Sequence, residues 1–195
     1  HLYEILMNFI RNDIVIPNIG ESQGRFWTPL ITTYFLFILT CNFLGLIPFF
    51  ELIPGGSSTV TGNFNTTAGL ASITFFAIIM AGSMKHGFLG YWKNMIPSGV
   101  PGPVLLILIP IEILGMFVRP FALTMRLGAN MTAGHIGMLA IFALPIILTA
   151  APVGIVSILL NTGIYFLEII VSFVQAYVFT LLSSVFIGMA IHIEH

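Results

Sequence analysis

The chain has 195 residues, of which 57% are hydrophobic and only 7% are charged, and its mean hydropathy is +1.05. These values lie far outside the range of soluble domains and indicate an integral membrane protein. The formal net charge of −1 gives no electrostatic reason to expect nucleic acid as a partner. The single cysteine, Cys41, lies in an apolar run, which excludes a disulfide framework or a cysteine metal site. We expect no metal ion and no cofactor.

The first part of the chain predicts an amphipathic segment followed by two transmembrane helices. Apolar runs of about 20 residues match the thickness of a bilayer and lack the alternation of an outer-membrane barrel, so helices are expected. Residues 1–26 mix apolar and charged side chains, which is typical of an interfacial segment. Upright transmembrane helices are predicted over 27–50 and 67–83, on either side of a loop rich in Gly, Ser, Thr and Asn.

Two longer apolar stretches follow, at 104–148 and 153–191. Each has about 40 residues and would measure about 60 Å as a helix, twice the length of an upright span. Neither contains a polar turn, which favours one long, steeply tilted helix over two short spans in each case. Prolines 110, 120 and 145 should bend the first helix without dividing it. The prediction is an all-α membrane protein with a single domain, 1–195, in which these helices form a hairpin.

Basic residues give the expected orientation. Lys85 and Lys93 lie between the second span and the hairpin, so this connection should face the cytoplasm. The uncharged loop 54–66 and the turn 149–152 should face outward, and the C-terminus should lie inside.

Polar and charged residues within the hairpin are candidates for function. A charge near the bilayer centre costs roughly 2.5–3.5 kcal/mol on insertion scales, so each such residue indicates a functional site by default. The candidates are Glu112, Arg119, Arg126, Asn130, His135, Asn161, Glu168, Ser172 and Gln175.

Counting from a turn at about residue 150 indicates which of these residues are neighbours. Arg126 lies 24 residues before the turn and Gln175 lies 25 after it, so they should occupy the same depth. His135 lies 15 before and Glu168 lies 18 after, a difference of about 4.5 Å in helical rise that one side chain can bridge. The sequence therefore predicts an imidazole and a carboxylate in contact, nearer the outward side.

Arg126 has a predicted surface of its own. Asn130 follows it by four residues, and nearly the same helix face holds Ala122, Ala129, Ala133 and Gly137. Small residues beside a cation allow another helix to approach closely. Because no acid of the hairpin lies at the depth of Arg126, we expect its counter-charge on a different subunit.

Structural interpretations of the same residues remain open. Arg126 would then be an anchor on backbone carbonyls, and Arg119 would extend to the interface. His135 and Glu168 would form a static buried pair.

The remaining polar residues have structural alternatives too. Glu112 would be a solvated interfacial acid, and Asn130 would form a hydrogen bond between helices. Ser172 would return its hydroxyl to the carbonyl four residues earlier.

Two other classes of membrane protein also bury polar groups. A secondary transporter with a charged site at mid-membrane is the main alternative, but that class often contains internal repeats with broken helices, and we find none in this sequence. An intramembrane protease needs a nucleophile and a base, for which Ser83, Lys85 and His86 are the candidates. They lie at the cytoplasmic end of a span, which disfavours this interpretation.

The polar residues stand in sequence blocks that resemble a known family. "MRLGANMTAGH" covers 125–135, and Gln175 follows Glu168 by seven residues in "LEIIVSFVQAYVF". Supporting blocks are "CNFLGLIP", "NTT", "GFLGYWK" and "PIEILGMFVRPFALTMRL". Over nearly its whole length the chain resembles subunit a of F-type ATP synthases, and the block around Arg126 is highly specific.

The resemblance implies a non-catalytic stator subunit that couples proton flow through two half-channels to rotation of a c-subunit ring and ATP synthesis. Its partners would be the ring carboxylates and the b-subunits of the peripheral stalk. A further transmembrane helix would precede residue 1. The membrane would be a bacterial inner (plasma) membrane, with the mitochondrial inner membrane as the alternative.

The resemblance also assigns roles to single residues. Arg126 matches the family's essential arginine, which acts as an electrostatic barrier, and Asn130 and Gln175 match its neighbours. His135 and Glu168 match the polar pair of the outward half-channel, in the mitochondrial-like order rather than the exchanged order of many bacterial relatives. Further half-channel lining is expected from Glu112, Ser172 and Arg119.

Overall fold

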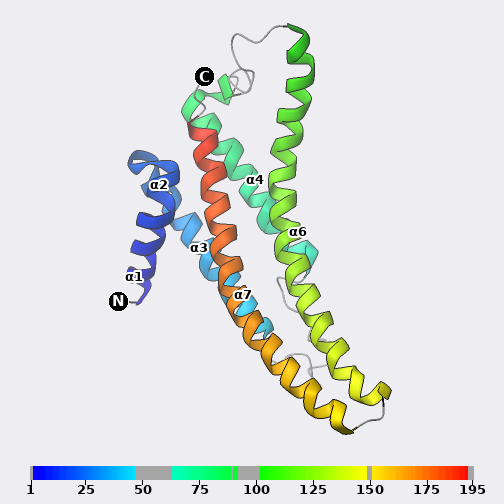
Figure 1. Ribbon diagram of the computed structural model, residues 1–195. Helices are drawn as coiled ribbons and strands as arrows, with labels where there is room; N and C mark the ends of the chain where they lie inside the picture. The colour runs from blue at the N-terminus through cyan, green and yellow to red at the C-terminus, as the bar shows by residue number, and fades with distance from the viewer. Residues whose placement is uncertain (1, 47–62, 89, 92–101, 149–150, 193–195) are drawn as a thin grey trace.

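The computed structural model describes residues 2–46, 63–88, 90–91, 102–148 and 151–192 (Figure 1). Within these ranges the secondary structure is helical and includes no strand, as the predicted all-α class requires. Four helices are long and apolar enough to cross a membrane. In chain order the elements are α1 Leu2–Phe9, the π-helix η1 Ile10–Val15, α2 Ile16–Ile19, α3 Glu21–Gly45, α4 Phe64–His86, α6 Gly102–Leu148 and α7 Ala151–Ile191.

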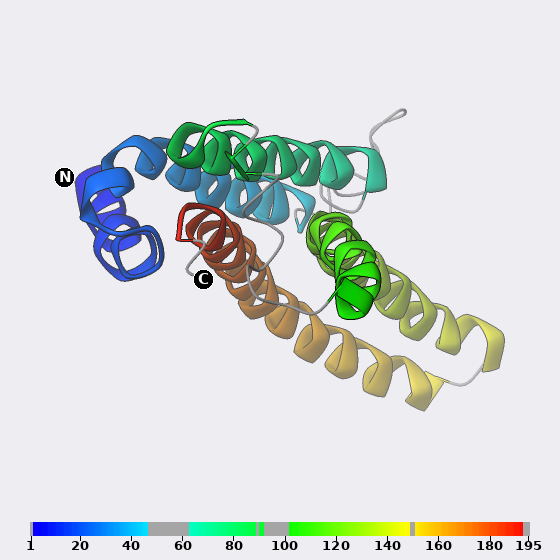
Figure 2. The same cartoon turned by 90° about the horizontal axis from the view of Figure 1, so that it is seen from above.

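The two long apolar stretches are each one continuous helix, as predicted. Helix α6 has 47 residues and α7 has 41. Pro110 and Pro145 lie within α6 and do not divide it. The two helices run antiparallel, are closest to each other near Leu148 and Ala151, and diverge toward their other ends (Figures 1 and 2).

The predicted bounds of the two shorter spans were less accurate. Helix α3 begins at Glu21, so residues 21–26 belong to it and not to the preceding segment. The break comes at Gly20, whose φ of 89° ends α2 and is accessible to glycine at little cost. Residues 47–50 of the predicted span lie outside the described residues. Helix α4 begins three residues earlier than predicted, where the Asn63 side chain accepts a hydrogen bond from the backbone N–H of Asn65 at 3.0 Å.

Helix α7 lies at the centre of the molecule. It packs against α3, α4, α6 and the N-terminal elements, and it crosses in front of α3 in Figure 1. Phe179 of α7 is 2% exposed and meets Tyr34 of α3 edge to face, with ring centroids 5.8 Å apart. Other fully buried side chains of this core are Phe35, Ile78, Leu127 and Ile187.

The N-terminal elements are attached to the last turns of α7. Ser184 donates a hydrogen bond to the carbonyl oxygen of Ile14 at 3.2 Å, and the His192 ring nitrogen Nε2 lies 3.0 Å from the carbonyl oxygen of Ile19. Ile10, Ile14 and Ile19 are fully buried. One face of the segment is therefore packed on the helices, while its position at a membrane interface stays a prediction.

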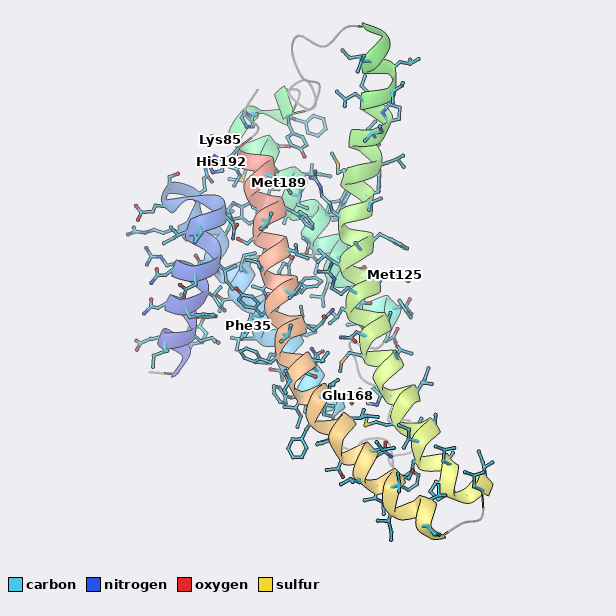
Figure 3. The ribbon with its side chains drawn as sticks, in the orientation of Figure 1. Phe35, Lys85, Met125, Glu168, Met189 and His192 are labelled. Atoms are coloured by element: carbon cyan, nitrogen blue, oxygen red, sulfur yellow. The ribbon has the colours of Figure 1, made fainter. Side chains whose placement is uncertain are left out.

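The end of α7 also meets the end of α4. His86 Nε2 lies 3.2 Å from the carbonyl oxygen of Ile191, and Lys85 is at the same end of the molecule as His192 (Figure 3). The end of α6 at Leu148 and the start of α7 at Ala151 lie at the opposite end of the molecule (Figure 1). The predicted orientation placed Lys85 and the C-terminus on one side of the membrane and the turn between the long helices on the other. The observed arrangement of the helix ends is consistent with that prediction.

Candidate functional site in the α6–α7 hairpin

Contacts near the turn set the register of the hairpin. Ser157 of α7 donates its hydroxyl to the carbonyl oxygen of Ile141 in α6. A Cβ atom at Gly154 would lie 3.9 Å from Pro145 Cβ, which is ordinary van der Waals contact. Residues at nearly equal distances from the turn therefore lie opposite each other, and this is the register that the sequence predicted.

The Glu168 side chain extends from α7 to the surface of α6, at the level of His135. Its side chain is only 5% exposed and extends toward α6 (Figure 3). Its carboxylate lies directly against Gly134, where an added Cβ would overlap Oε1. His135 is the next residue of α6 and is half-buried. The structure thus brings the carboxylate to the part of α6 that holds the imidazole.

A polar stripe continues from Glu168 along the buried face of α7. Ser172 is fully buried and Gln175 is 6% exposed, at four and seven residues after Glu168, on one helix face. One structural expectation for this stripe was wrong. The Ser172 hydroxyl has no hydrogen-bond partner among the described residues, so it does not return to the carbonyl four residues earlier.

Arg126 lies on an exposed face of α6, and the residue before it, Met125, is labelled in Figure 3. Ala122, Ala129 and Ala133 are exposed on the same face, and so is Asn130. The Arg126 side chain makes no hydrogen bond or ion pair with any residue that the structure describes. A permanent cation with small neighbours therefore faces outward from this chain, and among the described residues it has no anion.

Arg126 and Gln175 are at the same level but are not joined. The hairpin register places them opposite each other, yet within the described ranges no hydrogen bond links the two side chains. The helices have already diverged toward this level (Figures 1 and 2). Gln175 is instead packed inside, in the layer of Ala176 and Phe179.

Arg119 differs from Arg126 in its surroundings. It is half-buried, and its guanidinium carbon lies 5.7 Å from the centre of the Phe186 ring in α7, within the range of a cation–π interaction. The remaining candidate for half-channel lining, Glu112, is part of α6, but its side chain lies outside the described residues.

Sequence reasoning missed Asn42 as a site residue. This fully buried residue of α3 donates from Nδ2 to the carbonyl oxygen of Ser172 at 3.1 Å. Two turns earlier along α7, the Tyr165 hydroxyl donates to the carbonyl oxygen of Leu46 at 3.1 Å. The end of α3 therefore runs beside the part of α7 that contains Glu168. The sequence did contain a signal for Asn42, because it is an amide side chain inside a predicted apolar span. The same signal identified Asn130 as a candidate.

The other residue clusters do not form sites. The buried Ser83 hydroxyl has no hydrogen-bond partner in the described structure, and His86 Nε2 is placed on the carbonyl oxygen of Ile191. Ser83 is therefore not paired with a base. Across the described residues no group of three or more His, Cys, Asp or Glu side chains is placed to hold a metal ion.

Four helices are long enough to cross a membrane. Ionisable and amide side chains lie between the two longest helices and on their exposed faces. These features define a multi-pass helical membrane protein with a polar site in its spanning hairpin. The sequence profile described as ATP synthase A chain matches residues 1–188. The chain belongs to this family, that of ATP synthase subunit a.

Relatives of known name agree with this assignment. The chain is 43% identical to ATP synthase subunit a of Chloroherpeton thalassium, over all of this chain and 56% of that protein. It is 45% identical to ATP synthase subunit a 2 of Chlorobaculum tepidum, over 97% of this chain and 52% of that protein. It is 41% identical to ATP synthase subunit a of Myxococcus xanthus, over all of this chain and 62% of that protein. The chain spans about half the length of these relatives.

Proposed function

We propose that the chain is the proton-translocating stator subunit of a rotary F-type ATP synthase, non-catalytic in itself, in a bacterial inner membrane. The observation that supports this most is the exposed Arg126, with small residues around it and without an anion among the described residues. A passing carboxylate on a ring of c-subunits would supply the missing charge. The b-subunits of a peripheral stalk would hold the chain against the turning ring.

In this proposal Arg126 is a fixed electrostatic barrier. Arginine stays protonated in proteins, so it cannot relay protons. A ring carboxylate that arrives deprotonated is attracted to Arg126, which offsets part of the cost of holding that charge away from water. Asn130, exposed four residues later, adds an amide donor on the same face. The cation repels hydronium, so protons cannot pass directly between the two half-channels and must travel on the ring.

Glu168 and His135 serve as the relay of the outward half-channel. Imidazole exchanges protons at physiological pH, and a carboxyl group can accept and return a proton by the same chemistry. The position of the Glu168 carboxylate against Gly134 brings it beside the following residue, His135. Each proton that crosses a membrane potential of 100 mV gains about 2.3 kcal/mol, and several such steps per turn can drive ATP synthesis.

The test is Arg126→Ala in the assembled complex. We expect ATP-driven proton pumping to be abolished, while the membrane sector leaks protons passively because the barrier is gone. Lys85→Gln is the matched control, since it removes an exposed positive charge at the end of α4 and should pump normally. Normal pumping and coupling by Arg126→Ala would refute the barrier role.

Copurification separates this function from the main alternative. A ring of c-subunits and a peripheral stalk should copurify with the intact chain. Saturable uptake of a solute by the purified chain, without those subunits, would instead support a secondary transporter.

A further inference from the structure

The direction in which Arg126 points depends on the rotation of α6. Leu123, Leu127 and Met131 recur every four residues of this helix and are at most 2% exposed. Arg126 and Asn130 each come one residue before a buried one, and both are exposed. Successive residues of a helix are turned by about 100° about its axis. A modest rotation of this segment would therefore move the guanidinium away from the face that it now occupies.

Helix α4 contacts this segment of α6 through its first residue, Phe64. The two helices pack together, and α4 passes behind α6 in Figure 1. A Cβ atom at Gly128 would lie 3.1 Å from Phe64 Cε1 and 3.2 Å from its Cδ1. Because Gly128 has no side chain, the edge of the ring can lie directly against the α6 backbone. This contact is two residues after Arg126.

The first turn of α4 is itself held in place and makes a second contact with α6. The Asn63 side chain caps the helix, and the hydroxyl of the fully buried Thr67 donates to the carbonyl oxygen of Phe64 at 3.2 Å. On the α6 side, the Thr124 hydroxyl donates a long hydrogen bond of 3.5 Å to the carbonyl oxygen of Thr67. The turn thus meets α6 two residues before Arg126 and two residues after it.

We propose that Phe64 is a positioning residue for Arg126, which holds this turn of α6 at one depth and one rotation. The inference rests on the proposed function, in which Arg126 faces a carboxylate of the c-subunit ring. A phenyl ring suits this role because it is large, rigid and apolar, and the contact with Gly128 places it against the backbone that carries Arg126. Phe64 acts through α6 and not on the proton itself.

A displaced Arg126 would weaken the link between ring rotation and proton transfer. Coulomb attraction falls inversely with distance, so an increase from about 4 to about 5 Å removes about a fifth of it. The ring carboxyl then releases its proton less readily opposite the chain, because its anion is less stabilised there. A carboxyl that keeps its O–H bond through the whole passage exchanges no proton with either half-channel. The ring would then turn during ATP hydrolysis with fewer protons pumped.

The experiment compares Phe64→Ala, Gly128→Ala and the double variant in the assembled complex. The first change removes the ring, and the second adds a methyl group where the ring must give way by a few tenths of an ångström. In the double variant the methyl group occupies part of the emptied space. Phe64→Tyr keeps the ring, and Phe76→Ala is the matched control, because Phe76 is an exposed phenylalanine of the same helix.

The measurement is the number of protons pumped for each ATP hydrolysed, which does not depend on how much complex assembles. Misplacement by about 1 Å can cost up to about 10²-fold, so we expect at least about a threefold lower ratio in Phe64→Ala. Gly128→Ala should lower the ratio too, and the double variant should exceed Phe64→Ala. Phe64→Tyr and Phe76→Ala should keep the native ratio. A native ratio in Phe64→Ala, even with less complex assembled, would overturn the positioning role.

Cryo-EM maps of the same complexes test the position of α6 directly. The backbone at Arg126 should be shifted or rotated in Phe64→Ala and native in Phe64→Tyr. An unmoved backbone in Phe64→Ala would overturn the inference and leave the proposed function standing. Normal pumping by Arg126→Ala would refute the proposed function instead, and the maps would still decide whether Phe64 holds this turn of α6.

Discussion

The carboxylate of Glu168 occupies the space that a side chain at Gly134 would fill. A Cβ atom at Gly134 would overlap Glu168 Oε1 and would lie 2.8 Å from its carboxyl carbon Cδ. Gly134 is helical, so its role is close approach between α6 and α7 and not an unusual backbone angle. The absence of a side chain at this residue is what allows the acid to reach α6 next to His135.

Gly134→Ala should therefore displace the acid without changing any charge. The new methyl group forces the Glu168 side chain or the α6 backbone to move by about 1 Å, and misplacement on this scale can reduce a reaction rate by up to about 10²-fold. We expect at least about a tenfold loss of passive proton flux through vesicles that contain the assembled complex. Gly163→Ala in α7 is the control, because nothing lies within 4 Å of a Cβ at Gly163. Equal flux in the two variants would contradict the relay geometry.

Glu168→Gln should slow proton flow while leaving the packing intact. Glutamine has the same shape but cannot release a proton, and a positioned acid or base typically contributes about 10²-fold or more to proton transfer. Flux should be measured over a series of pH values in vesicles. Glu21→Gln, at the exposed start of α3, is the control and should behave as the native chain. Unchanged flux across the whole series in Glu168→Gln would mean that His135 and Glu168 form only a structural pair.

The course of the hairpin was predictable because it depends on properties that sequence records directly. The lack of a polar turn within α6 and α7 implied continuous helices, and the position of the turn implied the register. The contact of Glu168 with Gly134 and that of Ser157 with Ile141 both follow from that count. Counting residues gives the level of a side chain along a helix, but not the distance between two diverging helices. This is why the count placed Arg126 and Gln175 at one level although no hydrogen bond joins them among the described residues.

The residues that were missed depend on packing between helices distant in sequence. Asn42 is separated from Ser172 by 130 residues, and no periodicity within α3 indicates which helix it will meet. The start of α3 at Glu21 was missed for a different reason. The charged residues before Trp27 suggested an interfacial segment, although charges at the end of a long helix can lie beyond the hydrocarbon.

Gly188→Ala should loosen the N-terminal segment from α7. A Cβ at Gly188 would overlap the carbonyl oxygen of Asn18 and lie 2.9 Å from its carbonyl carbon. Because backbone atoms cannot rotate away as a side chain can, we expect a cost of about 1–3 kcal/mol in docking free energy. Trypsin cleavage after Arg11 in the π-helix, followed by mass spectrometry, should be at least about fivefold faster. Gly163→Ala is the control, because a Cβ at Gly163 meets open space, and this variant should be cleaved at the native rate. If Gly188→Ala were also cleaved at the native rate, the close contact at Gly188 would not be what holds the segment.

Arg119 should act mainly as an anchor between α6 and α7, in contrast to Arg126. Its guanidinium carbon is 5.7 Å from the Phe186 ring centre, and such cation–π contacts contribute about 0.5–1 kcal/mol, or more when shielded from water. A double-mutant cycle of Arg119→Gln and Phe186→Leu, measured by unfolding of the purified chain in detergent, should give a coupling energy of about this size. Additive effects would exclude the contact as an anchor. A loss of proton flux in Arg119→Gln that Phe186→Leu does not reproduce would then assign Arg119 to the half-channel lining, because the charge would matter independently of the ring.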